Sequence, residues 1–336
     1  MSPWAFTLAW SLPLGLLWRL YASDLGHFST LIFVFVAIPL ADLCGGRFTR
    51  TLSASAPLMT YRFMTWMGAA LQISLLVAAL IYVQTHTLTE LEMLDLCLSV
   101  GVCSGGTGIT LAHELIHRVA PRERFERGLG YILLAGAGYA HWGVEHVYGH
   151  HRFVATARDP ATARFGESLY RFLPRTLLGT LRSAWQIASE RRARGATRTH
   201  VVALAIGCET LTVSLLVLSG FWRAALLFVG QAIVAMILLE IINYVEHYGL
   251  LRRELAPNQY ERVNARHSWN ASERVTNLLL FNLQRHSDHH AHASRRYQML
   301  EHHDASPQLP FGYPTMVLMA TVPPLFFAVM NPRVKT

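Results

Sequence analysis

The chain has 336 residues, of which 52% are hydrophobic and only 15% carry a charged side chain. A soluble domain contains about 25% charged residues, so this composition indicates a membrane protein. The net charge of +8 does not indicate a nucleic-acid-binding protein, because the arginines lie between apolar runs rather than on a separate basic domain.

Six segments meet, or nearly meet, the length of about 20 mostly apolar residues that a membrane-spanning helix needs. They are residues 4–21, 28–43, 63–83, 94–112, 201–222 and 224–243. Short turns join the first segment to the second and the fifth to the sixth, so each pair is predicted to form a helical hairpin. The fourth segment contains four glycines and a serine between residues 101 and 108. Small residues let helices approach closely in lipid, so we expect this helix at the centre of the bundle.

The basic residues predict the orientation of the bundle, because cytoplasmic loops of membrane proteins carry an excess of lysine and arginine. If both chain ends are cytoplasmic, the outer face holds only three turns, near Arg19, His86 and Arg223. The inner face then holds the remaining basic residues, at positions 47–62, 118–198 and from 252 onward. We therefore predict a multi-pass protein of the bacterial inner membrane. Its N-terminus, C-terminus and histidine-rich segments are expected to be cytoplasmic.

The two long segments 113–200 and 244–312 are predicted to form one helical cytoplasmic cap. Residues 128–142 are apolar but too short and glycine-rich to span comfortably, so a buried or interfacial helix is expected. Residues 167–192 have an amphipathic pattern with scattered arginines, which is typical of a helix at the lipid headgroups. Residues 313–330 contain three prolines, which argue against a seventh span. The predicted fold is all-α and integral to the membrane: one domain, residues 1–336, with six transmembrane helices and a histidine-rich helical cap.

Histidines are concentrated in four short motifs. Residues 283–292 read Leu-Gln-Arg-His-Ser-Asp-His-His-Ala-His. The motifs His-Glu-Leu-Ile-His at 113–117 and Glu-His-Val-Tyr-Gly-His-His at 145–151 repeat a four-residue spacing, and Tyr-Val-Glu-His-Tyr-Gly at 244–249 follows the last predicted span. Residues three and four apart share one face of a helix, and imidazole is the commonest protein ligand for a transition metal. The predicted metal ligands are His113, His117, His146, His150, His151, His247, His286, His289 and His290.

One such motif alone is often a solvated helix face, but four motifs on one predicted membrane face favour metal binding. Nine imidazoles exceed the roughly four to six ligands that one ion holds, so two ions are expected; zinc, iron, copper and nickel all remain compatible. His292 follows the last motif but does not continue the spacing of three and four residues that His286, His289 and His290 show. The remaining histidines belong to no motif. Glu209 and Glu240 lie within predicted spans, where acids are costly and tend to be functional. Four acids beside the histidines are candidates to orient the imidazole rings or to bind metal directly: Glu114, Glu145, Glu246 and Asp288.

These motifs resemble those of the integral-membrane alkane 1-monooxygenase family, whose relatives include the hydroxylase subunits of xylene monooxygenases. The resemblance rests on the four histidine motifs and on the segments Ser294-Arg-Arg-Tyr-Gln298, His267-Ser-Trp-Asn270 and Thr276-Asn-Leu-Leu279, and it extends from about residue 60 to the C-terminus. It implies a six-helix bundle, two non-haem iron ions held by the nine histidines, and molecular oxygen as the oxidant. It also implies electrons from rubredoxin or a ferredoxin-type partner with its reductase. The N-terminus is shorter than is usual in the alkane enzymes.

The predicted function is hydroxylation of a C–H bond, either terminal or in an alkyl substituent, of a medium-chain alkane or alkyl-aromatic compound. The hydrocarbon would reach a cytoplasmic metal site through an apolar slot, and bulky side chains in the first three spans are candidates to end that slot: Phe33, Phe35, Phe63 and Trp66. An enzyme alternative is a fatty-acid desaturase or hydroxylase with the same histidine motifs, which its product would distinguish. A non-enzyme alternative is a membrane metal transporter or scaffold; a transporter would place its ligands near the bilayer midplane.

Overall fold

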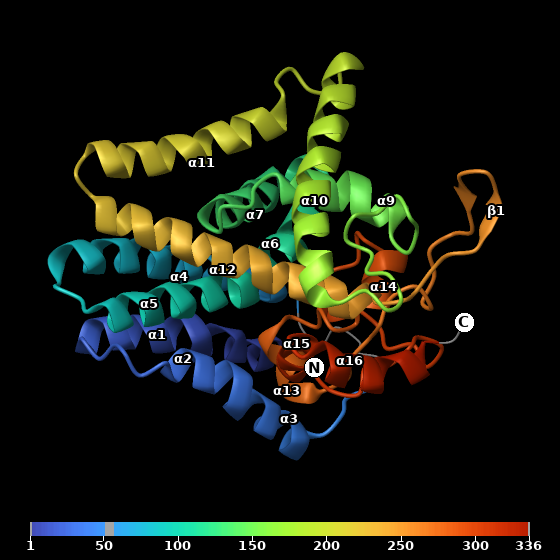
Figure 1. The fold of residues 1–336 in the computed structure, drawn as a ribbon, viewed down its shortest axis with the longest axis horizontal. Helices are drawn as coiled ribbons and strands as arrows, with labels where there is room; N and C mark the ends of the chain where they lie inside the picture. Colours follow the sequence, from blue (N-terminus) through green and yellow to red (C-terminus); the bar gives the residue numbers. More distant parts are fainter. Residues whose placement is uncertain (1, 51–56, 335–336) are drawn as a thin grey trace.

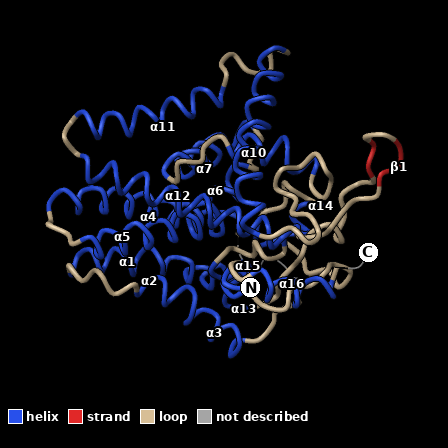
Figure 2. The backbone as a smooth tube through the Cα atoms, viewed as in Figure 1, coloured by secondary structure: helices blue, strands red, loops and turns tan. Residues whose placement is uncertain are grey.

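The computed structural model describes residues 2–50 and 57–334, and almost all regular structure in these residues is helical (Figures 1 and 2). The described residues form a single sheet, an antiparallel hairpin of β1 (Glu254–Ala256) and β2 (Gln259–Tyr260). This hairpin projects from the body of the molecule (Figure 2). Apart from these few residues, the prediction of an all-α protein is confirmed.

Four helices in the described residues are long and apolar enough to cross a membrane. They are α4 (Leu58–Thr85), the continuous helix Glu90–Ile116, α11 (Val201–Leu218) and α12 (Trp222–His247). The second consists of α5 (Glu90–Cys103), the π-helical segment η3 (Ser104–Gly108) and α6 (Ile109–Ile116). Thr89 and Glu92 form a capping box that begins α5. These helices correspond to the third to the sixth predicted span.

Two N-terminal helical segments correspond to the first two predicted spans. The first joins η1 (Pro3–Trp10), a 3-10 helix, to α1 (Ser11–Ala22). The second passes without a break through α2 (Ser29–Ile32), the π-helical η2 (Phe33–Ala37) and α3 (Ile38–Gly45). It is apolar but shorter than the about 20 residues that cross a bilayer without adjustment. The structure therefore gives four helices long and apolar enough to cross a membrane, with two N-terminal helical segments beside them.

The helix Glu90–Ile116 lies at the centre of the bundle. In its most apolar stretch of 18 residues 72% are buried, compared with 6% in α11. At Gly101 an added Cβ would lie 2.4 Å from the Cβ of Val234 in α12, so any larger residue would separate the two helices. The close packing expected from the small residues is therefore present. By contrast, α11 lies at the edge of the molecule beside α12 (Figure 1).

The two ends of the bundle differ. One end carries three turns, between α1 and α2, α4 and α5, and α11 and α12, and Arg223 donates a hydrogen bond to the His86 carbonyl there (3.5 Å). The other end, called the histidine-bearing end, carries the remaining elements. These are η4 (Pro121–Glu123), α8 (Trp142–Glu145), η5 (His146–His150), α9 (His151–Phe153), α10 (Leu169–Ala193), α13 (Arg274–Leu279), α14 (His286–Ala291), η6 (Tyr297–Met299), α15 (Tyr313–Ala320), α16 (Pro323–Met330) and η7 (Asn331–Arg333), together with the start of α7 (Arg124–Gly136). From there α7 runs back along the bundle, where the Gly136 carbonyl accepts a hydrogen bond from Gln231 of α12 (2.8 Å).

Three further predictions concern segments at this end, residues 128–142, 167–192 and 313–330, and the structure agrees with them in part. The amphipathic stretch is the long helix α10, and the short apolar stretch is α7 with the turn that follows it. The proline-containing stretch breaks into α15 and α16, because Pro323 begins a new helix. The N-terminal segment also reaches this end, since the ring of Phe6 stacks on Phe281 at 5.8 Å between centroids.

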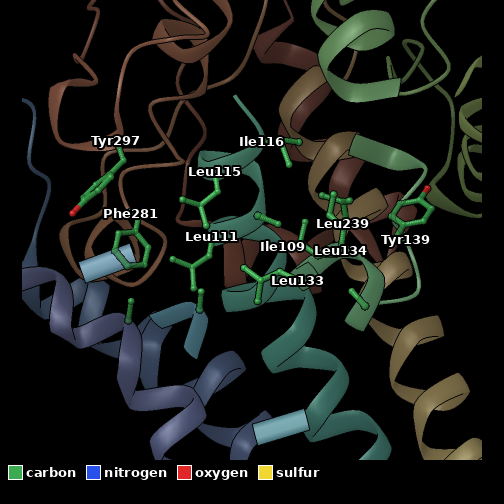
Figure 3. Packing of buried hydrophobic residues seen from close by; sticks show 14 of the residues in the cluster. Ile109, Leu111, Leu115, Ile116, Leu133, Leu134, Tyr139, Leu239, Phe281 and Tyr297 are labelled. Carbon is green, nitrogen blue, oxygen red and sulfur yellow. The ribbon is translucent and has the colours of Figure 1, made fainter. Parts of the chain in front are cut away.

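A large hydrophobic cluster joins the bundle to the histidine-bearing end (Figure 3). In it, Leu111 and Leu115 of α6 pack among side chains from α7 and α12, such as Leu133 and Leu239. Burial of one such leucine contributes roughly 1.5–3 kcal/mol to stability. Because α6 also carries His113, this packing fixes the position of a predicted metal ligand.

Candidate metal centre

The nine predicted ligands come together from four parts of the chain. His113 lies in α6 and His117 directly follows that helix; His146 and His150 lie in η5, and His151 begins α9. His247 is the last residue of α12, and the other three histidines lie in α14. All nine side chains are buried except His151, which is half-buried.

Five of these histidines form one group, called the five-histidine group: His113, His117, His146, His151 and His289. Nε2 of His146 lies 3.1 Å from Nε2 of His117 and 3.1 Å from Nε2 of His151. Nε2 of His151 lies 3.0 Å from Nε2 of His289. One nitrogen from each ring lies within 4.8 Å of all the others.

The other four histidines form the four-histidine group: His150, His247, His286 and His290. Nε2 of His290 lies 2.9 Å from Nε2 of His286 and 3.2 Å from Nε2 of His150, and Nε2 of His247 lies 3.3 Å from Nε2 of His286. The two groups adjoin, since the rings of His151 and His290 are 4.5 Å apart.

Nitrogens arranged in this way fit a pair of metal ions. Two nitrogens that lie about 2.1 Å from one ion and at right angles to each other are separated by about 3.0 Å, which matches the observed spacing. Burial lowers the pKa of His117, His146 and His289 well below its usual value, so these rings are neutral and keep a lone pair. Nε2 of His113 is buried without a hydrogen-bond partner among the described residues. One cation bound in each group would satisfy these converging nitrogens.

A buried aspartate outside the motifs orients one of the rings. Oδ2 of Asp159 lies 3.0 Å from Nδ1 of His150, and the hydroxyl of Thr162 donates to the same oxygen (2.6 Å). Burial alone would raise the pKa of Asp159, but His150 and these hydrogen bonds hold that pKa below its usual value. The carboxylate therefore accepts the N–H of Nδ1, which leaves the lone pair of His150 on Nε2, toward the other histidines.

Of the four acids predicted beside the histidines, Glu246 contacts one of the nine rings. Its Oε2 lies 3.1 Å from Nε2 of His286, and its Oε1 accepts a hydrogen bond from the Tyr313 hydroxyl (2.6 Å). The ring of His247 has a different neighbour, with Nδ1 3.4 Å from the hydroxyl of Ser268. Glu246 is therefore a carboxylate at the edge of the four-histidine group, held in place by Tyr313.

The other three acids have different partners in the described part of the chain. Glu114 pairs with Arg118 (2.9 Å), and Glu145 accepts from Ser183 (3.2 Å). Burial raises the pKa of Glu145 well above its usual value. Asp288 accepts hydrogen bonds from Arg295 (2.8 Å) and lies 2.8 Å from Nε2 of His303. These contacts connect the histidine-bearing segments to their surroundings, and they do not orient the nine rings.

Sequence reasoning missed Asp159, Ser268 and Tyr313, because none of them lies in a histidine motif. His292 stands outside both groups, with Nδ1 3.2 Å from Asp288. The intramembrane acid Glu240 accepts hydrogen bonds from Tyr139 (2.8 Å) and Thr176 (2.7 Å), which makes it a packing partner between helices.

An apolar cavity, called the metal cavity, ends at the histidines. His113, His146, Glu246 and His286 line it at that end. The rest of the lining is almost entirely apolar and includes Leu12, Val34, Phe35, Ile38, Val102, Ile109, Leu238, Leu239, Leu279, Leu280 and Val317. Among the described residues, no lysine or arginine lines it. A ligand in this cavity would thus be surrounded by hydrocarbon, with one end at the imidazoles.

Four aromatic residues were predicted as candidates to end the apolar slot, and three of them do not line the metal cavity. Phe35 lines the cavity, but Phe33 and Phe63 are exposed on the outer surface of their helices. Trp66 donates a hydrogen bond to Glu126 (3.1 Å), away from the cavity. The sequence does not show which face of a helix is turned inward, so bulk alone did not identify the lining residues.

Comparison with known proteins gives a consistent result. A family model described as fatty acid desaturase matches residues 91–318. The chain is 43% identical over 330 residues to alkane 1-monooxygenase 1 of Pseudomonas aeruginosa. This alignment covers 94% of the chain and 86% of that protein. The chain is 48% identical over 244 residues to alkane 1-monooxygenase 2 of the same organism, covering 71% of this chain and 63% of that protein, which is less than two thirds of its length. It is also 27% identical over 248 residues to the xylene/toluene monooxygenase hydroxylase component XylM of Pseudomonas putida.

Proposed function

Since the chain belongs to the alkane 1-monooxygenase family, within the wider fatty acid desaturase family, we propose that it is an oxygen-dependent membrane hydroxylase with two non-haem iron ions. Its substrate would be a medium-chain alkane or an alkyl-aromatic compound. One observation carries the proposal: nine imidazoles in two adjoining groups close the end of a largely apolar cavity. That arrangement brings an inert hydrocarbon to a metal centre and offers it few polar contacts elsewhere.

Each of the two histidine groups would bind one of the two iron ions. The five-histidine group would hold one iron and the four-histidine group the other, with the Glu246 carboxylate beside the second. When bound, the iron pair supplies the activation of molecular oxygen that oxidation of an unactivated C–H bond requires. Asp159 fixes the tautomer of His150, and Tyr313 holds Glu246. The apolar lining keeps water away from the reacting carbon.

The composition of the cavity favours a neutral hydrocarbon over a free fatty acid. A buried carboxylate needs a cation or several hydrogen-bond donors, and among the described residues no lysine or arginine lines the cavity. The alternative function, consistent with the match to the fatty acid desaturase family, is a desaturase that acts on an esterified acyl group. The product separates the two, because a hydroxylase forms an alcohol and a desaturase forms a double bond.

The reaction also needs an electron donor. Hydroxylation places one oxygen atom in the alcohol and the other in water, which consumes two electrons and two protons per turnover. Rubredoxin or a ferredoxin-type protein with its reductase would supply the electrons at the histidine-bearing end. Exposed arginines there, such as Arg152, Arg253 and Arg262, suit an acidic partner. Anionic lipid headgroups would attract the same residues.

The membrane arrangement completes the proposal. The two N-terminal segments would act as short spans beside the four long ones, giving six in all. The histidine-bearing end, with both chain ends, would face the cytoplasm of a bacterial inner membrane, and segments 113–200 and 244–312 would form its metal-binding cap. Arginines concentrated at that end support this orientation.

The test uses full-length protein in lipid nanodiscs, loaded with iron and supplied with rubredoxin, its reductase and a panel of alkanes and methyl-aromatics. We expect two irons per protein molecule and an alcohol product that depends on oxygen. His289→Ala and His150→Ala should each lower the iron content toward one and abolish turnover while the protein remains in the membrane, because each removes a ligand from a different group. His86→Ala, at the opposite end of the bundle, is the control. Full activity with zinc alone, a double-bond product, or no oxygen-dependent product at all would refute the proposal.

A further inference from the structure

A second cavity lies against η3, on a different face of that segment from the metal cavity. Gly105 and Gly106 of η3 line the metal cavity, whereas Ser104 and Gly108 line the second cavity. The remaining residues that line it belong to α4 and α7: Gln72, Ile73, Leu76, Val77, Ile132, Leu133 and Gly136. One segment of a single helix therefore separates two cavities.

Gln72 is the polar centre of the second cavity. It is only 4% exposed, and its Nε2 donates a hydrogen bond to the Ser104 hydroxyl (3.2 Å). Its Oε1 is buried and has no partner among the described residues. If the amide is turned over, Oε1 faces Ser104 and Nε2 is left without a partner instead. In either orientation, one end of the buried amide has no partner within residues 2–50 and 57–334.

The surroundings of Gln72 limit what that partner is. The lining carries no charged side chain among the described residues, so a carboxylate or an ammonium group would be buried without a counter-ion. Val77 and Ile132 are 50% and 56% exposed on the lipid-facing surface, so the occupant enters from the bilayer. Gln72 lies near the middle of α4, far from both headgroup layers, so the polar group of a phospholipid would not reach it.

We infer that the second cavity binds an aliphatic alcohol, with its hydroxyl on Gln72 and Ser104 and its alkyl tail between α4 and α7. A hydroxyl both donates and accepts a hydrogen bond, so it satisfies the Gln72 amide in either orientation. An alkane of the same length fills the same space but leaves the amide unpaired. The inference rests on the proposed function for the source of its ligand, because hydroxylation of an alkane produces an alcohol beside this cavity.

The binding test needs no turnover. Iron-loaded protein in nanodiscs, without an electron donor, is irradiated with a 1-alkanol that carries a diazirine near its middle carbon, or with the matching diazirine alkane, and the labelled peptides are mapped. The alcohol probe should label the α4 and α7 residues of the second cavity, and excess 1-decanol, but not decane, should compete. Equal labelling of this cavity by both probes, or alcohol labelling confined to the metal cavity, would overturn the inference.

Three variants test the role of the amide. Gln72→Leu keeps the volume and should weaken alcohol labelling about three- to tenfold, the usual effect of one hydrogen bond. Gln84→Leu, the same change on the same helix outside the cavity, should leave it unchanged. Ile132→Trp, at the exposed mouth, should block labelling while Gln72 stays in place, which covers the case in which Gln72→Leu folds poorly. Wild-type labelling in both Gln72→Leu and Ile132→Trp would refute the assignment.

Parallel turnover under ¹⁸O₂ separates the inference from the proposed function. Alcohol that copurifies with the protein and carries ¹⁸O is the enzyme's own product, whereas unlabelled alcohol comes from the membrane. Alcohol labelling of the second cavity without any hydroxylation would support the site and refute the proposed function. Hydroxylation without such labelling would refute the site alone.

Discussion

Oδ2 of Asp159 lies 3.0 Å from Nδ1 of His150, and both side chains are buried. Asp159 is itself held in place, since its other oxygen accepts the backbone N–H of Ala161 (3.1 Å). The pair sets which nitrogen of His150 carries the proton, so that Nε2 faces His290 at 3.2 Å. Asp159 is therefore a positioning residue: it would act on the metal through the ring of His150.

Asp159→Asn should weaken iron binding at the four-histidine group by about 10–100-fold, the usual effect of losing such a partner. An asparagine of the same shape accepts a weaker hydrogen bond and no longer compensates the charge that the ring shares with the ion. The measurement is iron content per protein molecule during titration with a chelator. One of two irons should be lost at lower chelator concentration than in the wild type.

Asp304→Asn is the control for this prediction, because Asp304 is fully exposed and lies away from both histidine groups. It should retain both irons as the wild type does. Chelator curves that coincide for wild type and Asp159→Asn would show that Asp159 has no role in orienting His150.

How much of this site the sequence predicts depends on helix geometry. The four-residue spacing correctly places His113 and His117 near each other, because residues four apart share a helix face. Direct neighbours behave differently, since successive side chains point about 100° apart on a helix. His150 and His151 therefore fall in different groups, as do His289 and His290. For the same reason Glu114 and Asp288, although next to histidines in the sequence, pair with arginines instead.

The partners missed from the sequence come from segments without a repeating pattern. Asp159 lies in the loop after α9, and Tyr313 begins α15. Only the tertiary fold brings them to His150 and Glu246. The fold itself was more predictable than the site partners, because long apolar runs and glycine-rich packing faces are properties of single helices.

The metal-free protein should be less stable at pH 5.5 than at pH 7.5. Burial lowers the pKa of six histidines outside the spanning helices well below its usual value: His117, His146, His151, His286, His289 and His290. In the unfolded protein each titrates near about 6.5. Below that pH the unfolded protein binds protons that the folded protein does not, so the free energy of unfolding falls as the pH falls.

The measurement for this prediction is the Tm of metal-free protein across that pH range. Replacing both His146 and His286 by glutamine in one variant should make the Tm less dependent on pH, because two of the histidines with a lowered pKa are then absent. A wild-type Tm that rises on acidification would contradict the burial of neutral imidazoles.

A buried ion pair should hold the N-terminal hairpin against the central helix. Arg19 donates to Oδ2 of Asp95 (2.7 Å), and the same oxygen accepts the backbone N–H groups of Gly26 (3.0 Å) and Phe28 (3.3 Å). Asp95→Ala leaves a partly buried guanidinium unpaired and should cost about 3–5 kcal/mol of stability. The readout is thermal unfolding in detergent, with iron content unchanged. Combining Arg19→Met with Asp95→Leu should recover part of the lost stability, because it removes both charges. Glu90→Ala is the control and should have little effect, because Glu90 lies in the same helix as Asp95, in the first turn of α5, but is exposed. Equal Tm values for all variants would contradict a stabilising role for the Arg19–Asp95 pair.

Substrate length should depend on two positions that face the metal cavity. Phe35 lines it, and Gly106 lines it with open space where a Cβ would be added. Phe35→Ala enlarges the cavity and should shift the preferred alkane to longer homologues, whereas Gly106→Val adds bulk and should shift it to shorter ones. Each methylene gained or lost is worth about 1–3 kcal/mol in discrimination, so relative rates for adjacent alkane lengths should change roughly tenfold or more. The measurement is hydroxylation across a series of alkane lengths, normalised to iron content.

Phe33→Ala is the matched control, because Phe33 lies in the same π-helical segment as Phe35 but is 38% exposed on the outer surface. It should keep the wild-type length profile. If Phe33→Ala and Phe35→Ala shift the profile equally, the effect comes from loosening η2 and not from the shape of the cavity. If neither Phe35→Ala nor Gly106→Val changes the profile, this cavity does not measure the substrate. Because a hydrocarbon offers the protein no polar group to recognise, shape at these positions is the property by which one alkane length is distinguished from the next.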